Sequence, residues 1–210
     1  EGPKPIGAWN HQECLPTTER DSNDVLEADP TFPTRDAVQV IADGQVLFNF
    51  TTDAEKVDAF ARKYGRRKWG GESIYEDKGW RNFLQERFQP VVLDAIRQTI
   101  GEKDCIDLNN LCQYVQNAEA ATRGDVRKLN TSQSLTEAAA DIAEQINVQL
   151  RLAFGDDFFE NVRYQNLKIR FEPAVQEQIS AAQAKRTEVA NARLEAQRAV
   201  EEAKGQRRVA

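Results

Sequence analysis

The 210-residue sequence has no methionine, only one histidine, and no apolar run near the ~18 residues that span a bilayer. The lone histidine, His11, lies in a proline-rich stretch without a partner to orient it as a base, so we interpret it as a surface residue. The sequence contains no G-x-S-x-G, phosphate-loop or H-E-x-x-H motif. We therefore expect no enzyme, no catalytic residue, no cofactor and no metal site.

Because the chain lacks an initiator methionine, we interpret it as a piece of a longer protein whose N-terminal membrane anchor lies outside the sequence. Its formal charge of −6 is uneven, since residues 1–60 carry 12 acidic and 4 basic side chains. A nucleic-acid-binding protein usually shows clustered positive charge, so we exclude a nucleic-acid partner. A content of 40% hydrophobic and 30% charged residues indicates a soluble, folded, helix-rich chain.

Prolines are concentrated at the start of the chain, where residues 1–36 hold five of the seven. This N-terminal segment is therefore predicted to be loop-like. In residues 37–51 apolar and polar side chains alternate on both sides of Asp43-Gly44. An Asp-Gly pair between alternating runs favours a type I′ turn, so we predict a β-hairpin here.

Two helices are predicted next from their caps and apolar spacing. Residues 52–65 begin with a capping box formed by Thr52 and Glu55 and end at a glycine. Residues 78–101 carry large apolar side chains at helical spacing. Pro90 should kink or split this second helix, because it removes an amide donor and clashes with the preceding turn.

The second half of the sequence predicts two further helices, a strand and a terminal helix. A short helix covers residues 108–115, and an amphipathic helix opens with a capping box at Ser134 and stops at Gly155. Alternation in residues 162–171 indicates a strand. Pro173 is well placed to start the final helix, because a proline in the first turn loses no bonded amide.

The final helix has few large aliphatic side chains but a seven-residue repeat of small ones. Its charges balance, with five basic and five acidic residues between 174 and 204. Small side chains permit close approach of a neighbouring helix, and balanced charges suit identical neighbours. Lateral self-association is thus the leading interpretation, and a solvated spacer helix is the alternative. The predicted oligomerisation seam consists of Val175, Ala182, Val189, Ala192, Ala196, Ala199 and Ala203.

The three cysteines leave two alternatives open. Cys105 and Cys112 would lie about 10.5 Å apart along a continuous helix, too far for a disulfide. They can pair if the chain before Asp107, a plausible N-cap, is not helical and folds back. Otherwise Cys112 is a buried free thiol on the apolar face of the short helix. Cys14 is left without an assigned role.

One basic cluster contains an aromatic residue, in the run Arg66, Arg67, Lys68 and Trp69. The ordinary interpretation is a solvated loop. The alternative is contact with anionic lipid headgroups, because adjacent cations beside tryptophan suit a membrane surface.

Two stretches together resemble the SPFH or band 7 family of stomatins, prohibitins and flotillins. The first is PTRDAVQVIADGQVLFNFTTD, residues 33–53, and the second is VRYQNLKIRFEPAVQEQISAAQAKRTEVANARLEAQRAVEEA, residues 162–203. The resemblance covers about residues 27–204. It implies an α+β fold with two small lobes in residues 37–172, after the segment 1–36, followed by a truncated coiled-coil-type helix in residues 173–210. Long loops in the middle depart from the family pattern and suggest a divergent bacterial branch.

The resemblance also implies a non-enzymatic membrane scaffold that assembles into rings or cages through an N-terminal anchor and the long helix. Some relatives surround membrane-anchored AAA+ proteases, so such a protease is a candidate partner. The expected location is the bacterial cell membrane, with the domain on the extracytoplasmic side if the cysteines are oxidised. The rival hypothesis is a soluble adaptor whose C-terminal helix binds a different protein. An enzyme with an unusual site is the third.

Overall fold

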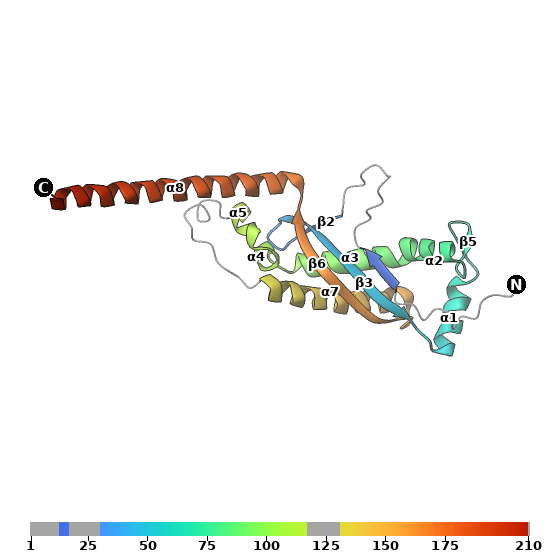
Figure 1. Cartoon of the computed structure of the whole chain (residues 1–210). Helices are drawn as coiled ribbons and strands as arrows, with labels where there is room; N and C mark the ends of the chain where they lie inside the picture. The colour runs from blue at the N-terminus through green and yellow to red at the C-terminus, as the bar shows by residue number, and fades with distance from the viewer. Residues whose placement is uncertain (1–12, 17–29, 117–130, 210) are drawn as a thin grey trace.

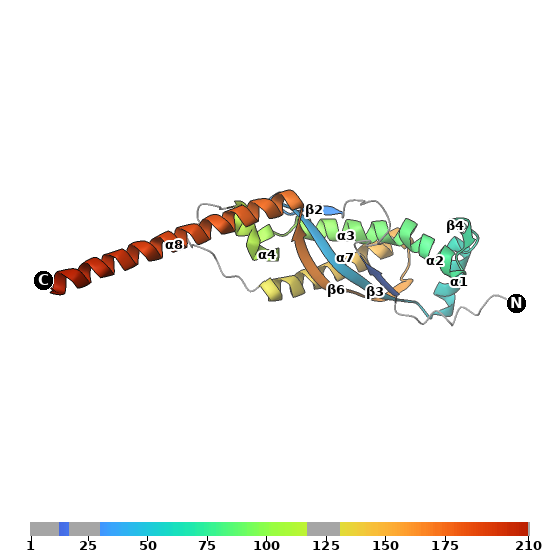
Figure 2. The same ribbon diagram turned by 45° about the horizontal axis from the view of Figure 1, so that its top comes forward.

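The computed structural model describes residues 13–16, 30–116 and 131–209. They form an elongated body with a small β-sheet, and a long helix extends from one end of that body (Figures 1 and 2). A smaller lobe lies at the other end (Figures 1 and 2). The arrangement is the predicted α+β class with a long C-terminal helix.

The bounds of the elements are as follows. The strands are β1 (Glu13–Pro16), β2 (Thr31–Pro33), β3 (Gln39–Phe50), β4 (Lys68–Trp69), β5 (Glu72–Ser73) and β6 (Phe159–Phe171). The helices are α1 (Ala54–Tyr64), α2 (Asp77–Phe83), the π-helical η2 (Leu84–Phe88), α3 (Gln89–Gly101), α4 (Cys105–Leu108), the 3₁₀ turn η3 (Asn110–Cys112), α5 (Gln113–Gln116), α7 (Thr131–Phe154) and α8 (Pro173–Val209).

Strand β3 is the centre of the main sheet. It pairs with β6 along nearly its whole length, from Val40 to Phe50, in antiparallel register. β1 and β2 each pair antiparallel with a separate stretch of β3, on the edge of β3 opposite to β6. The prediction of a loop-like N-terminal segment was wrong here, because β1 and β2 come from residues 1–36 and complete the sheet. Pairing with a distant strand leaves little local signal in the sequence.

The predicted hairpin over residues 37–51 was also wrong, since β3 runs without a break through Asp43 and Gly44. Gly44 lies beneath the ring of Tyr164 on β6, and a Cβ at this position would meet that ring at 2.4 Å. The glycine thus permits close approach between strands rather than a turn. A two-residue turn occurs instead between β4 and β5, at Gly70 and Gly71, which both have positive φ.

Two β-bulges bend β6 around the body. The register against β3 shifts twice, and each time β6 holds one residue more than the facing stretch of β3. Asn161 and Asn166 lie in these stretches with φ of 52° and 57°. Asparagine tolerates the left-handed region better than most residues, so the bulges form at little cost. The resulting curvature of β6 is visible in Figure 1.

Helices α3 and α7 cover one face of the sheet and bury its core. Their apolar faces meet the inward side chains of β3 and β6, and the other face of these strands is mainly polar. Before Pro90 the helix changes to the π-helical turn η2, which confirms the expected irregularity at this proline. The fully or nearly fully buried contacts include Val40, Val46, Phe48, Val92, Ile96, Ile100, Ile142, Ile146 and Leu150.

The smaller lobe is built around aromatic side chains. Phe60 packs edge-on against Phe83 and Phe158, and Trp80 stacks on Phe83. α1, the β4–β5 hairpin and α2 supply this cluster, which continues into the core beneath the sheet. Gly79 brings α2 against the backbone of Ser73, where a Cβ would lie 1.9 Å from the carbonyl oxygen. The lobe and the sheet therefore share one core.

Two predicted helix starts require correction. The N-cap of α1 is Asp53 rather than Thr52, because its carboxylate accepts from the amides of Glu55 and Lys56. α7 begins at Thr131, so Ser134 lies inside the helix instead of capping it. The predicted stop at Gly155 is confirmed, and its φ of 75° explains the glycine.

Candidate functional site: the root and the arm of helix α8

Helix α8 begins at Pro173, as predicted, and its 37 residues span about 55 Å at 1.5 Å per residue. Two parts of the helix differ in exposure. We call residues 173–189 the root, because side chains along one stripe are buried or half-buried against the body. We call residues 190–209 the arm, in which every side chain from Ala190 to Glu202 is exposed. Figures 1 and 2 show the arm extending away from the body.

The root is held by one fully buried side chain and one polar contact. Ile179 is 0% exposed, and Val175 and Ala182 pack beside it against the core. One turn further on, Nη1 of Arg186 donates to Oη of Tyr114 on α5 at 2.7 Å. These contacts fix one face of the root against α5 and the end of β6.

The predicted seam is therefore divided between two environments. Val175, Ala182 and Val189 belong to the root and are half-buried, so the first two are occupied within the same chain. Ala192, Ala196 and Ala199 belong to the arm and are exposed. The side chain of Ala203 lies outside the described part of the structure.

The arm carries a narrow apolar stripe that continues from the root. At 100° per residue the stripe members fall within an arc of about 100°. Leu194, which is 54% exposed, lies on nearly the opposite side of the helix. A surface of small side chains on one face suits close packing of another helix. The stripe consists of Ala192, Ala196, Ala199 and Val200, and Val189 at the end of the root lies in line with it.

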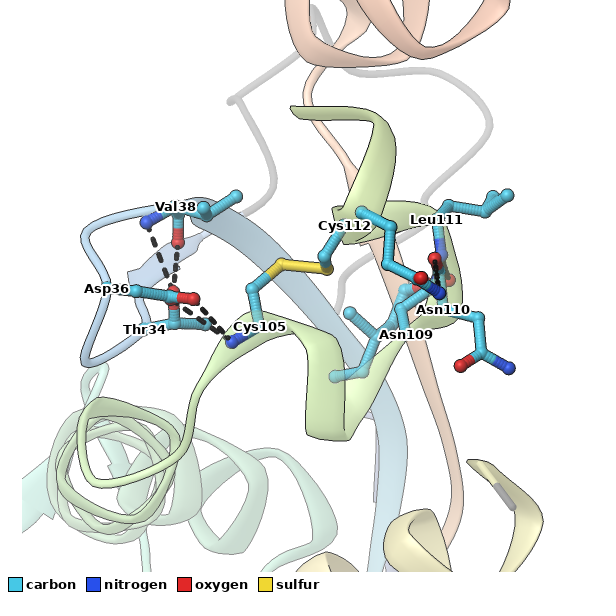
Figure 3. The surroundings of a disulfide bond; sticks show 10 residues. Thr34, Asp36, Val38, Cys105, Asn109, Asn110, Leu111 and Cys112 are labelled. Atoms are coloured by element: carbon cyan, nitrogen blue, oxygen red, sulfur yellow. Dashed lines mark hydrogen bonds between the residues drawn. A yellow bond between two sulfur atoms is a disulfide. The ribbon is translucent and has the colours of Figure 1, made fainter. Parts of the chain in front are cut away.

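A disulfide joins two residues of the segment 105–116, which contacts the root through α5. Cys105 and Cys112 are joined with Cα atoms 5.7 Å apart, and both are fully buried. The helix break that allows this lies at Asn109, which is extended, and not before Asp107 as the sequence suggested. Nδ2 of Asn109 donates to the carbonyl of Ile169 on β6 at 3.2 Å. Figure 3 shows the disulfide between the turn that carries Asp36 and the residues around Asn109.

The turn between β2 and β3 binds the start of this segment, at Cys105. Both carboxylate oxygens of Asp36 accept from the amide of Cys105 at 3.1 Å, and Oγ1 of Thr34 bonds the backbone of Val38 within the turn (Figure 3). The run PTRD, which contributed to the family resemblance, therefore braces the disulfide segment. The predicted boundary between residues 36 and 37 lies within this turn.

An exposed ion pair adds to this attachment. Nε of Arg35 donates to Oδ1 of Asp104 at 2.8 Å. The hydrogen bond from Arg35 lowers the pKa of the Asp104 carboxyl below its usual value and raises the pKa of the guanidinium. Because both groups face solvent, the pair contributes little to stability.

The residues of the basic cluster also lie in two different environments. Arg66, Arg67 and Lys68 are exposed, but Trp69 is only 4% exposed. Its ring packs on Phe83, and its Nε1 donates to the carbonyl of Tyr64 at 3.4 Å. Trp69 is thus a core residue and cannot be part of a lipid-contacting surface.

A metal-binding cluster is absent from the part of the chain that the structure describes. Within it, no group of three or more histidine, cysteine or acidic residues could hold a metal. His11 lies outside the described residues. An apolar hollow in the smaller lobe has a volume of about 20 Å³, roughly the space of one water molecule. Its lining consists of Phe50, Val57, Phe60, Ala61, Ile74, Tyr75 and Trp80.

Sequence reasoning missed the residues that seat the helix. Ile179 is a large aliphatic residue but falls outside the predicted seam, and Tyr114 and Arg186 carry no motif. The only usable signal was the concentration of Val175 and Ile179 at the start of an otherwise alanine-rich helix.

The described residues thus form a mixed α/β body that presents a long, mostly exposed helix. The model of the SPFH domain / Band 7 family matches residues 8–207, and the chain belongs to this family. The family is one of membrane-associated and generally non-catalytic scaffolds. No curated protein and no solved structure matches the chain. Among the helices of the described residues, none is long and apolar enough to cross a membrane.

Proposed function

We propose that the protein is a membrane-bound scaffold whose copies associate side by side through the arm of α8 and close into a ring or cage. The observation that carries this proposal is the apolar stripe of the arm, which the body leaves exposed. Each small side chain buries little area, so one pair of arms binds weakly. Many copies held on one membrane compensate, because anchoring raises their effective concentration.

The proposed role is to enclose a patch of the bacterial cell membrane and restrain the proteins within it. A membrane-anchored AAA+ protease is the partner that family resemblance suggests. The disulfide supports an extracytoplasmic position for the body, because such bonds persist in oxidising compartments. The same stripe could seat a helix of a different protein, which is the adaptor alternative.

The mass and shape of the protein extracted from membranes test the proposal. Light scattering and electron microscopy should show large closed particles of one polypeptide. A monomer would contradict the scaffold, and a one-to-one complex with another chain would establish the adaptor instead. Mass spectrometry of the same particles identifies any enclosed protease.

We further propose that the three exposed cations at the β4 hairpin contact anionic headgroups. Replacing all three with alanine should weaken binding to vesicles that contain phosphatidylserine, with the largest effect at low salt. Unchanged binding would remove this proposal. A control variant removes the same charge from other exposed positions and should bind like the wild type. The test positions are Arg66, Arg67 and Lys68, and the control positions are Arg151, Arg163 and Lys168.

A further inference from the structure

The segment from Cys105 to Gln116, which we call the seat, touches the root of α8 through α5. It consists of three short turns of helix, none longer than four residues. Helices this short are not stable alone and keep their shape only through tertiary contacts. The position of the root therefore depends on what holds the seat.

The disulfide joins the start of the seat, at Cys105, to the residue that directly precedes α5. Cys105 is fastened to the turn of β2 and β3 through its amide and Asp36. Cys112 directly precedes α5, whose Tyr114 receives the hydrogen bond from Arg186. The sulfur–sulfur bond thus links the sheet turn covalently to the residues that touch the root. Packing and the bond from Asn109 to β6 also hold the seat.

We propose that the seat is redox-sensitive and controls how firmly α8 is held in its direction. In the oxidised form the root is fixed to the body. A dithiol reductant donates two electrons and two protons, the sulfur–sulfur bond breaks, two thiols form, and the reductant becomes a disulfide. The reduced seat then holds α5 less firmly, and the root moves more freely while the sheet and its helices stay folded.

Burial determines how this reaction can proceed. Both cysteines are 0% exposed, so a reductant reaches the sulfur atoms only when the seat opens locally. Opening of the seat and mobility of the root are therefore coupled in both directions. Contacts that hold the root, such as that of Arg186 with Tyr114, should slow reduction.

Amide hydrogen exchange on the oxidised and reduced chain tests the inference in the monomer, independently of any assembly. Reduction should speed exchange of the amides of residues 177–189 at least ten-fold and leave those at the centres of α3 and α7 unchanged. Equal exchange of the root in both forms would overturn the inference. A loss of protection throughout the body would also overturn it, because the disulfide would then be a general stabiliser.

Two matched pairs of variants sharpen the test. Cys105→Ser with Cys112→Ser should reproduce the reduced pattern, and Cys14→Ser should not. Arg186→Ala should speed both root exchange and the reduction of the disulfide by a dithiol several-fold. Arg198→Ala, which removes an exposed arginine of the arm, should change neither. If Arg186→Ala leaves the reduction rate unaltered, the proposed coupling is wrong, whether or not the serine variants fold.

Discussion

At the scale of single residues, Asn109 decides whether the two cysteines can meet. Seven residues of continuous helix rise about 10.5 Å, beyond the roughly 4.4–6.8 Å between Cα atoms of a disulfide. Asn109 has φ −153° and ψ 121°, which ends α4 and brings the Cα atoms to 5.7 Å. The sequence indicated that a disulfide between these cysteines would require a break in the helix. The position of the break could not be predicted, because Asp107 resembles an N-cap residue. The amide of Cys105 at the start of α4 is bound instead by the carboxylate of Asp36, which lies far away in the chain.

Gly79 provides a stability prediction at this scale. Gly79→Ala should lower the free energy of unfolding by about 1–3 kcal/mol, because a Cβ would overlap the backbone carbonyl of Ser73 and force α2 away. Urea denaturation measures this change. Gly101→Ala is the matched control, since the nearest atom there is the carbonyl oxygen of Pro33 at 3.7 Å. We expect that variant to be neutral or slightly stabilised, and equal losses in both would refute the steric explanation.

The pair of Arg35 and Asp104 provides a pH prediction. The pKa of Asp104 is lowered in the folded chain by the hydrogen bond from Arg35, so the pair stabilises the fold only while the carboxylate is charged. Its contribution is present above the ordinary carboxyl pKa of about 3.9 and is lost as the pH falls through the lower folded value.

A double-mutant cycle of Arg35→Ala and Asp104→Asn measures this contribution. We expect a small favourable coupling at about pH 7 that shrinks as the pH falls below the ordinary carboxyl pKa of about 3.9 and through the lower folded value. A coupling that grows on acidification would contradict the assignment. The small size follows from the exposure of both groups.

At the scale of elements, α8 combines two parts that are stabilised in different ways. The root follows the ordinary rule for a surface helix, in which an apolar stripe is buried against the body. The arm has high intrinsic helix propensity from its many alanine, glutamate, glutamine and arginine residues, so it forms without a partner surface. The seam continues across both parts, but the body already occupies its first two residues, Val175 and Ala182.

Ile179 and Leu194 test this division on one helix. Ile179→Ala should lower the free energy of unfolding by roughly 2–5 kcal/mol, because it leaves a cavity in a fully buried site. Leu194→Ala should change it by less than about 0.5 kcal/mol, because that side chain is exposed. Chemical denaturation followed by circular dichroism gives both values. Comparable losses would mean that the arm also rests on the body.

The elements differ in how far the sequence could predict them. The end of α7 at Gly155 and the start of α8 at Pro173 depend on local backbone preferences, and both were predicted correctly. The continuous strand β3 was not, because Asp43-Gly44 has the local pattern of a turn. Tyr164, whose ring packs against Gly44 in the continuous strand, lies far along the chain. The contacts of the seat with α8 and with the sheet could not be predicted for the same reason, because they join distant segments.

At the scale of the whole molecule, the arm and the smaller lobe lie at opposite ends of the body (Figures 1 and 2). Contacts at one end are therefore far from contacts at the other. In the proposed assembly, arms can pack against each other while the lobe and its exposed cations meet a different surface. A rigid root is needed for this, because neighbouring arms pack side by side only if they leave their bodies in the same direction.

The apolar stripe of the arm gives the last prediction. Ala192→Glu with Ala196→Glu places two charges on the stripe, so the protein should fold but no longer form large particles. A carboxylate buried between close helices is costly, and identical neighbours repeat that cost at every contact. Light scattering of the membrane-extracted protein measures the loss, and circular dichroism checks that helix content is retained.

Thr187→Glu with Asn191→Glu is the matched control for this experiment. It adds the same charge at the same spacing, but both positions lie on the side of α8 away from the stripe, and both are exposed. Its particles should match those of the wild type, because the added carboxylates remain in water. If both double variants lose assembly, added charge alone is responsible. If both assemble, the copies associate through another surface and the stripe has a different partner.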